Sequence, residues 1–274
     1  MKYRIILACA FLLAACSKDE DSAWLGYAVG ETAFIAAPQA GWVARIMVQR
    51  GDSVKAGEVL FTLDDTSQSA ARDQAQASLA LAGGQMGEAK ASLELTNKQL
   101  TRQRALLRNG AGTVQSFDIA KANYDQATAR IAQIVAQEAQ ARAALANIVY
   151  QLSERNVVAR TTGRVEDVFF RIGEYAPAMT PVVSILPPQN VFVRFFIPET
   201  QFAHVRMGQR VAISCDGCTT GITAAISFIS QREEFTPPVI FSIGNREKLV
   251  FKIEARARGG LKLNPGQPVQ VRPF

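Results

Sequence analysis

Two heptad repeats lie one after the other in the chain and constrain its fold more than any other feature. The first has a residues at Leu79, Met86, Leu93, Leu100 and Leu107, with Ala82, Ala89, Thr96 and Gln103 at the d positions. The second alternates steps of three and four, broken only where Glu138 takes an apolar slot, through Phe117, Ala120, Tyr124, Ala127, Ile131, Ile134, Ala141, Leu145, Ile148 and Leu152. Such a/d seams predict two helices that pack along their length.

The segment between the repeats predicts a reversal of the chain. Gly110 and Gly112 are suited to ending the first helix, and Ser116 is placed to cap the second. We therefore expect an antiparallel coiled-coil hairpin over 66–155 with its tip at about 109–115, and arms of about 60 Å at 1.5 Å per residue. The alternative is an ordinary helical bundle, but no further long helical pattern is present to complete one.

Three glycines, Gly83, Gly84 and Gly87, interrupt the first repeat. Each weakens a helix by up to about 1 kcal/mol relative to alanine. They predict bending or local disorder in the first arm.

The hairpin is flanked by two segments of the same design, 34–60 and 157–183. In each, short strands rich in β-branched residues are punctuated by glycine, and a glycine–acid pair, Gly51-Asp52 or Gly173-Glu174, lies about ten residues after the first glycine. These segments form an internal repeat.

From about residue 190 the chain instead alternates strands and turns, which predicts a small antiparallel β-barrel after a linker at Pro187–Asn190.

The first residues read as an export signal. Lys2 and Arg4 precede a short apolar run, Ile5–Leu13, which is too short to span a bilayer. The sequence Leu13-Ala14-Ala15-Cys16 resembles a bacterial lipobox, which implies removal of 1–15 and lipidation of Cys16, including an acyl chain such as palmitate. The alternative is an ordinary signal peptide that happens to contain a cysteine.

The motifs together resemble a known family. Ala37-Pro38-x-x-Gly41, Gly51-Asp52-x-Val54-x-x-Gly57 and Leu63-Asp64-Asp65 are similar to the half-motifs of a biotinyl/lipoyl domain. The order of lipobox, half-motif, hairpin, half-motif and β segment resembles the HlyD-like periplasmic adaptor (membrane fusion) proteins over nearly all of the mature chain. The resemblance implies an elongated α+β fold, in which a split lipoyl-like domain is interrupted by the hairpin and followed by a β-barrel.

The expected domains follow from these motifs. They are a lipoprotein signal peptide at 1–15, a tether at 16–30, lipoyl-like half 1 at 31–65, the hairpin at 66–155, lipoyl-like half 2 at 156–187 and the barrel at 188–274.

The two remaining paired cysteines, Cys215 and Cys218, are expected to form a local disulfide, because disulfides are the default outside the cytoplasm. A redox-active pair would usually open a helix, whereas this pair follows a strand-like segment. A zinc site needs two more ligands, and the chain has one histidine, His204, which we expect to be structural or solvent-facing.

The sequence favours a protein that is not an enzyme and has no metal or cofactor. It has no P-loop, no GxSxG motif and no His pair, and Asp64-Asp65 fits a role in helix capping. A lipoyl carrier would have a lysine at the turn where Leu63–Thr66 stands, and none is present. The net charge of +6 is spread along the chain, which argues against a nucleic-acid partner.

The resemblance implies an adaptor that links an inner-membrane transporter to a TolC-like outer-membrane channel. Such adaptors form rings, commonly of six copies or of paired protomers. The segment 234–240 resembles adaptors of ABC-type exporters, and Arg102, Leu106 and Thr113 resemble the Arg-x₃-Leu-x₆-Ser tip motif that contacts the channel, with threonine in place of serine. The alternative is a stand-alone envelope lipoprotein with a structural coiled coil. The expected location is the periplasm, with the lipid in the inner membrane, although Ser17 after the lipid cysteine is compatible with the outer membrane.

Overall fold

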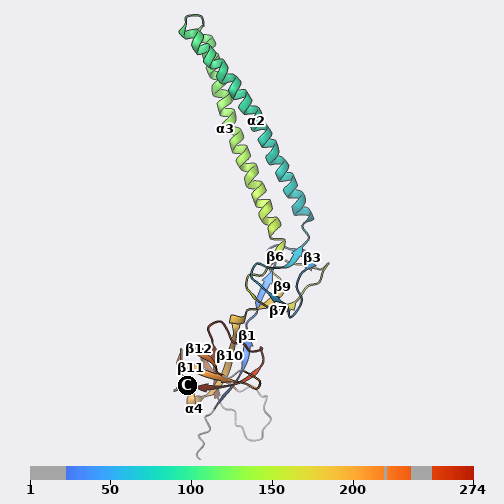
Figure 1. Cartoon of the computed structure of the whole chain (residues 1–274), viewed down its shortest axis with the longest axis vertical. Coiled ribbons are helices and arrows are strands. Elements are labelled where there is room, and N and C mark those ends of the chain that lie inside the picture. Colours follow the sequence, from blue (N-terminus) through green and yellow to red (C-terminus); the bar gives the residue numbers. More distant parts are fainter. Residues whose placement is uncertain (1–22, 219–220, 236–248) are drawn as a thin grey trace, which may run out of the picture.

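The chain has three parts stacked end to end: a β-barrel, a lipoyl-like β domain and a helical hairpin (Figure 1). We describe it from a computed structural model, which covers residues 23–218, 221–235 and 249–274. This is the elongated α+β architecture expected from the sequence, and the fold prediction is confirmed.

The β domain consists of two four-stranded sheets, with strand orders β2-β9-β7-β4 and β6-β5-β3-β8. Each sheet combines strands from before and after the hairpin. The strands before the hairpin are β2 (Ala33–Ala36), β3 (Gly41–Ile46), β4 (Ser53–Val54) and β5 (Val59–Leu63). Those after it are β6 (Asn156–Val158), β7 (Gly163–Val168), β8 (Tyr175–Ala176) and β9 (Pro181–Leu186). Their inward side chains form one core, which includes Val43, Leu60, Phe61, Val165, Val182 and Ile185.

The internal repeat folds into two matching turns. The carboxylate of Asp52 accepts a hydrogen bond from the Gln49 amide at 2.7 Å, and that of Glu174 accepts one from the Arg171 amide at 2.8 Å. The glycine before each acid has a positive φ, 95° at Gly51 and 87° at Gly173, which a residue with a Cβ rarely adopts. The positive φ therefore explains why a glycine precedes the acid in both halves of the repeat.

The two turns also interlock the halves of the domain. Gly51 donates a backbone hydrogen bond to Val165 of the second half at 2.9 Å, and Gly173 donates one to Val43 of the first half at 2.8 Å. The halves thus bind each other reciprocally, and we expect neither half to fold alone.

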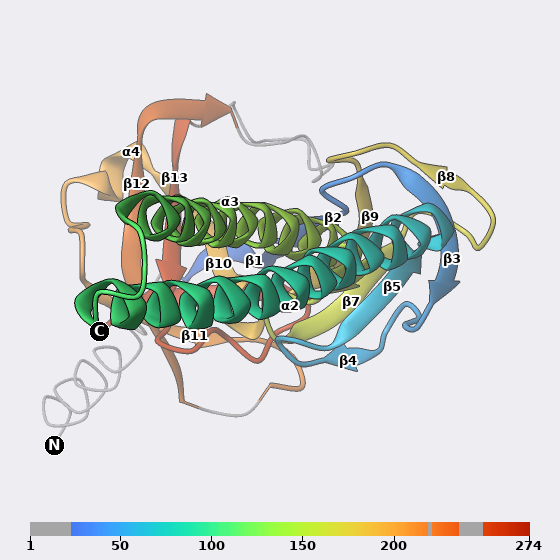
Figure 2. The same ribbon diagram turned by 90° about the horizontal axis from the view of Figure 1, so that it is seen from above.

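The hairpin consists of α2 (Thr66–Arg108) and α3 (Val114–Ser153). They run side by side in both views (Figures 1 and 2). Every predicted seam residue is buried or partly buried, and Met86, Ala89 and Ile134 form a buried cluster between the helices. The predicted seam is confirmed.

Helix α2 continues without interruption through Gly83, Gly84 and Gly87, so the local disorder predicted there is wrong. A Cβ at any of these glycines would meet no atom within 4 Å, which places them away from the partner helix. The loss of intrinsic helix propensity is offset by the packing of the seam on α3.

The barrel is closed, with strand order β1-β10-β13-β12-β11-β14. Its strands are β1 (Trp24–Gly30), β10 (Val191–Pro198), β11 (Arg210–Ser214), β12 (Ile222–Phe235), β13 (Leu249–Arg256) and β14 (Pro268–Pro273). A short helix, α4 (Glu199–Phe202), follows β10, and a 3₁₀ turn, η1 (Pro188–Asn190), occupies the predicted linker.

The first strand corrects the tether predicted for residues 16–30. Residues 24–30 form β1, which pairs with β10 on one side and β14 on the other and so closes the barrel. Trp24 and Ala28 point into the barrel core, where Trp24 stacks on Phe195. The barrel therefore includes a strand from before the lipoyl-like domain, and the chain enters and leaves that domain from the barrel side.

Candidate functional site

The hairpin tip is a tight reversal of five residues, 109–113. The amide of Ala111 donates to the Leu106 carbonyl at 2.9 Å, and Gly110 has a φ of 73° and donates to Leu107 at 3.1 Å. A Cβ on Gly112 would lie 3.0 Å from the Leu107 nitrogen, so the loop packs closely on the end of α2. The geometry of the reversal thus favours glycine at both positions, through the positive φ at Gly110 and the close backbone contact at Gly112.

Helix α3 begins differently from the sequence prediction. The N-cap is Thr113, whose hydroxyl accepts a hydrogen bond from the Ser116 amide, and the helix starts at Val114. The prediction that Ser116 caps this helix is wrong by one turn. The side chain of an N-cap residue can reach the backbone amide three positions later, and Ser116 lies three positions after Thr113. Thr113 also has the extended backbone that an N-cap needs.

The three residues of the predicted tip motif lie at the tip, but they differ in what they offer a partner. Arg102 and Leu106 are exposed and four residues apart, which puts them on one side of α2. The Leu106 side chain is 37% exposed although it neighbours the seam residue Leu107. Thr113 is also exposed, yet its hydroxyl is already engaged as the helix cap.

Sequence reasoning missed two further apolar side chains at the tip. Val114 is 64% exposed and Ile119 is 56% exposed, both in the first turns of α3. Neither belongs to the seam, and this departure from the heptad pattern was the only signal that could have identified them.

The tip end of α2 is basic. Arg102, Arg104 and Arg108 are exposed there, and the sequence has no Asp or Glu between Glu94 and Asp118. Arg108 lies in the last turn of α2, where a positive charge is favourable beside the helix C-terminus. The tip thus combines exposed leucine, valine and isoleucine with a local excess of positive charge.

At the opposite end of the hairpin, Asp64 and Asp65 precede α2. The carboxylate of Asp64 accepts hydrogen bonds from the Thr66 hydroxyl at 3.1 Å and the Thr66 amide at 3.4 Å, whereas Asp65, the N-cap, makes no side-chain cap bond. The two carboxylates are therefore used unequally at the start of the helix.

At the end of α3, the Tyr150 hydroxyl is hydrogen-bonded to Glu154. This bond, together with the negative charge of Glu154, raises the pKa of the Tyr150 phenol above its ordinary value.

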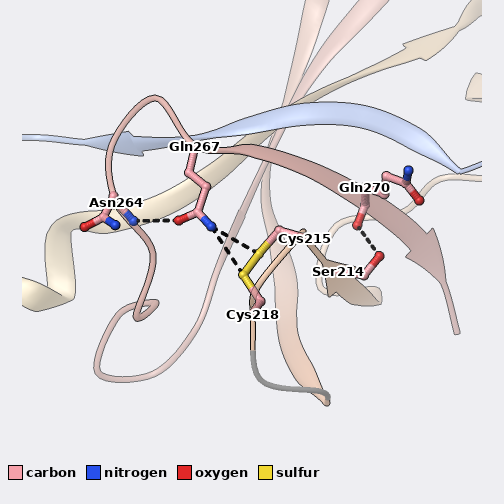
Figure 3. Close-up of a disulfide and its surroundings, with 6 residues drawn as sticks. All are labelled: Ser214, Cys215, Cys218, Asn264, Gln267 and Gln270. Atoms are coloured by element: carbon pink, nitrogen blue, oxygen red, sulfur yellow. Dashed lines mark hydrogen bonds between the residues drawn. A yellow bond between two sulfur atoms is a disulfide. The ribbon is translucent and has the colours of Figure 1, made fainter.

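In the barrel, Cys215 and Cys218 form a disulfide just after β11 (Figure 3). The side-chain amide of Gln267 donates to both sulfurs, at 3.5 Å and 3.4 Å, and its oxygen accepts from the Asn264 amide at 3.1 Å. This arrangement ties the turn after β11 to the loop before β14. Within the described ranges, no group of three or more His, Cys, Asp and Glu side chains could hold a metal ion.

His204 lies in an exposed turn after α4, where its amide donates to the Gln201 carbonyl at 3.2 Å. Cys16, Ser17 and the predicted signal peptide lie outside the described residues, as does most of the 234–240 segment. Among the helices that are described, none is long and apolar enough to cross a membrane.

No family model matches the chain. It is similar to the fatty acid resistance protein FarA of Neisseria gonorrhoeae, with 25% identity over 84% of this chain and 68% of FarA. It is also similar to the colistin resistance protein EmrA of Acinetobacter baumannii, with 25% identity over 84% of this chain and 78% of EmrA. The crystal structure of MacA from Actinobacillus actinomycetemcomitans superposes with a TM-score of 0.71 at 17% identity, over 92% of this chain and 78% of MacA. The MacA comparison shows a shared fold.

Proposed function

We infer that this chain is a membrane fusion protein, a periplasmic adaptor that links an inner-membrane transporter to an outer-membrane channel in an efflux or secretion system. The observation that carries this conclusion is the arrangement of the three parts. The barrel lies at one end of the molecule, the tip of the hairpin lies at the other, and the lipoyl-like domain joins them (Figure 1). Similarity to FarA and EmrA over most of the chain supports the same assignment.

Lipidation of Cys16 would place the barrel at a membrane. Cys16 precedes Trp24, the first residue of β1, by eight residues, and eight residues span at most about 28 Å when fully extended. A lipid anchor at Cys16 would therefore hold the barrel close to the bilayer surface. The hairpin would then point away from that membrane, with arms of 43 and 40 residues that reach about 60 Å.

We propose that the anchoring membrane is the inner membrane and that the transporter is of the ABC type. The inner membrane suits a barrel that contacts a transporter. The resemblance of 234–240 to adaptors of ABC exporters supports the second point. We further propose that the exposed tip meets a TolC-like channel through Arg102 and Leu106.

The proposed role also requires several copies of the chain. A single rod of two helices cannot enclose a conduit, so we propose a homo-oligomeric ring, six-fold in keeping with the family. The role is mechanical: the chain seals and couples two membrane proteins, and we propose no bond-making chemistry for it.

A hairpin-deleted variant provides a direct test. Strands β5 and β6 are antiparallel neighbours, with Thr62 opposite Asn156, so a short Asn-Gly turn can replace residues 66–153 and leave the β domain closed. In cells that lack the native gene, the full chain should restore export of a panel of fluorescent efflux substrates. The hairpin-deleted chain should itself reach the periplasm and fold, but it should not restore export of the substrates. Full export with the hairpin-deleted chain would contradict the adaptor role.

A further inference from the structure

The root of the hairpin contains a buried arginine with an unusual set of partners. Arg155 directly follows the C-cap of α3, and only 8% of its surface is exposed. Its Nη1 donates to the Ala40 carbonyl at 3.0 Å, while its buried Nε has no hydrogen-bond partner. Among the described residues, no carboxylate forms an ion pair with it. Burial of a guanidinium without a counter-charge costs free energy. Loss of its one side-chain hydrogen bond should therefore destabilise the chain more than loss of an ordinary hydrogen bond.

The residue after Ala40 is a glycine for a reason of space. A Cβ at Gly41 would lie 2.5 Å from Nη1 of Arg155, a distance that real Cβ atoms essentially never show, so the end of this buried side chain would have to move. The φ of Gly41 is not in the left-handed region, so its backbone conformation does not require glycine. Gly41 and Arg155 are 114 positions apart in sequence, yet a side chain at position 41 would displace the end of Arg155.

The segment around Ala40 and Gly41 contacts both of the connections between the β domain and the hairpin. The side chain of Gln39 donates to Glu154 at 3.0 Å, and the Trp42 carbonyl accepts from the Asp64 amide at 2.8 Å. We call residues 39–42 the root bracket. In addition, the Leu63 amide donates to the Arg155 carbonyl at 2.9 Å, and this hydrogen bond joins the two connections to each other.

These contacts matter because the covalent connection at the root is thin. Only residues 64–65 and 154–155 join the β domain to two helices of 43 and 40 residues. A small rotation at the root therefore becomes a large displacement at the tip. Contacts with a third segment of chain remove that freedom.

We propose that Arg155 is the positioning residue of the hairpin: through the root bracket it fixes the direction in which the hairpin leaves the β domain. The importance of this direction for export rests on the proposed adaptor role. The direction itself is a property of the isolated chain and is measured without a transporter or a channel.

Pulsed electron paramagnetic resonance can measure this direction. Spin labels at the exposed positions Arg50 in the β domain and Lys90 in α2 report the angle of the hairpin, and unnatural amino acids leave the native cysteines intact. The native chain should give one narrow distance distribution. Arg155→Ala and Gly41→Ala should both broaden it, and Arg155→Lys should broaden it less. Arg160→Ala, an exposed arginine five residues later, is the matched control and should leave it unchanged.

Hydrogen exchange gives a local readout at the same root. In Arg155→Ala, exchange of the Leu63 and Asp64 amides should accelerate by about tenfold or more, the factor that corresponds to the loss of one hydrogen bond to a charged group. Amides in the centre of the barrel should keep their native rates.

A double-mutant cycle separates positioning from general damage. Since the added methyl of Gly41→Ala collides with the Arg155 side chain, its effect on stability should shrink when Arg155 is already alanine. Gly83→Ala, whose Cβ meets no atom within 4 Å, should be additive with Arg155→Ala.

Distance distributions of native width in both Gly41→Ala and Arg155→Lys would overturn the proposal, and so would additive effects of Gly41→Ala and Arg155→Ala. If Arg155→Ala does not fold, these two measurements still decide the matter, with the cycle built on Arg155→Lys. A broadened distribution with normal export would keep the positioning role and contradict only its importance for the adaptor.

Discussion

The hydroxyl oxygen of Thr113 accepts a hydrogen bond from the Ser116 amide at 3.2 Å and lies 2.7 Å from the Ser116 hydroxyl. The residue that the tip motif assigns to channel contact is therefore also the N-cap of α3. The hydroxyl at this position has a structural task inside the tip before any partner binds.

Replacement of Thr113 should therefore affect stability in a predictable order. Thr113→Ser keeps the cap and should leave both stability and export unchanged. Thr113→Val removes the cap and should lower the free energy of unfolding by about 1 kcal/mol, which chemical denaturation can measure. Ser116→Ala keeps the capped amide and loses only the contact between the two hydroxyls, so as the control it should lower the free energy of unfolding by less than Thr113→Val does. Equal stability of Thr113→Val and the native chain would contradict the cap.

The exposed pair on α2 should be needed for export but not for folding. Replacement of Arg102 and Leu106 with Asp puts negative charge on a basic tip and removes an apolar contact, so we expect export to be abolished. The melting temperature of the variant and the binding of its barrel to the transporter should be unchanged, because both side chains are exposed. The matched control is Leu81→Asp with Lys90→Asp, which makes the same change of charge lower on the same helix. Full export by the tip variant would place the contact elsewhere.

The Cys215–Cys218 pair should be oxidised in the exported protein. Alkylation followed by intact-mass measurement, with and without reductant, should show no free thiol at either position before reduction. Replacement of both cysteines with serine should lower the free energy of unfolding by about 2 kcal/mol, since the closed loop is short. Two freely alkylated thiols would exclude the disulfide, and a bound metal would revive the zinc alternative.

Cys16 should be the membrane attachment point. Cys16→Ser should abolish labelling with palmitate, and the variant should either retain its signal peptide or be released as soluble protein. The native chain, labelled in parallel, is the control. Palmitate that remains on the variant would rule out the lipobox interpretation.

The parts of the fold that repeat locally were predictable from the sequence. The seam from Leu79 to Leu107 follows from heptad spacing alone, and Met86 and Leu100 are indeed buried. The turns at Gly51 and Gly173 follow from glycine beside an acid. In each case the signal lies within a few residues of the structure that it predicts.

Features that depend on distant pairing were not predictable in the same way. Strand β1 closes the barrel by pairing with Val191–Pro198 and Pro268–Pro273, and nothing in its seven residues indicates those partners. The contact between Gly41 and Arg155 is equally remote in sequence. The cap at Thr113 was missed for a different reason: an N-cap is set by backbone conformation, and Thr113 and Ser116 are both good candidates by residue type.

The central claim is that one chain contacts different membrane proteins at its two ends, and site-specific photocrosslinking in intact cells tests it most directly. The crosslinking residue is placed at Leu106 in the tip or at Met207, an exposed residue between α4 and β11 in the barrel. We predict that Leu106 crosslinks to an outer-membrane channel and Met207 to an inner-membrane transporter, both identified by mass spectrometry. Crosslinks from both positions to the same protein, or to neither class of membrane protein, would contradict the adaptor role.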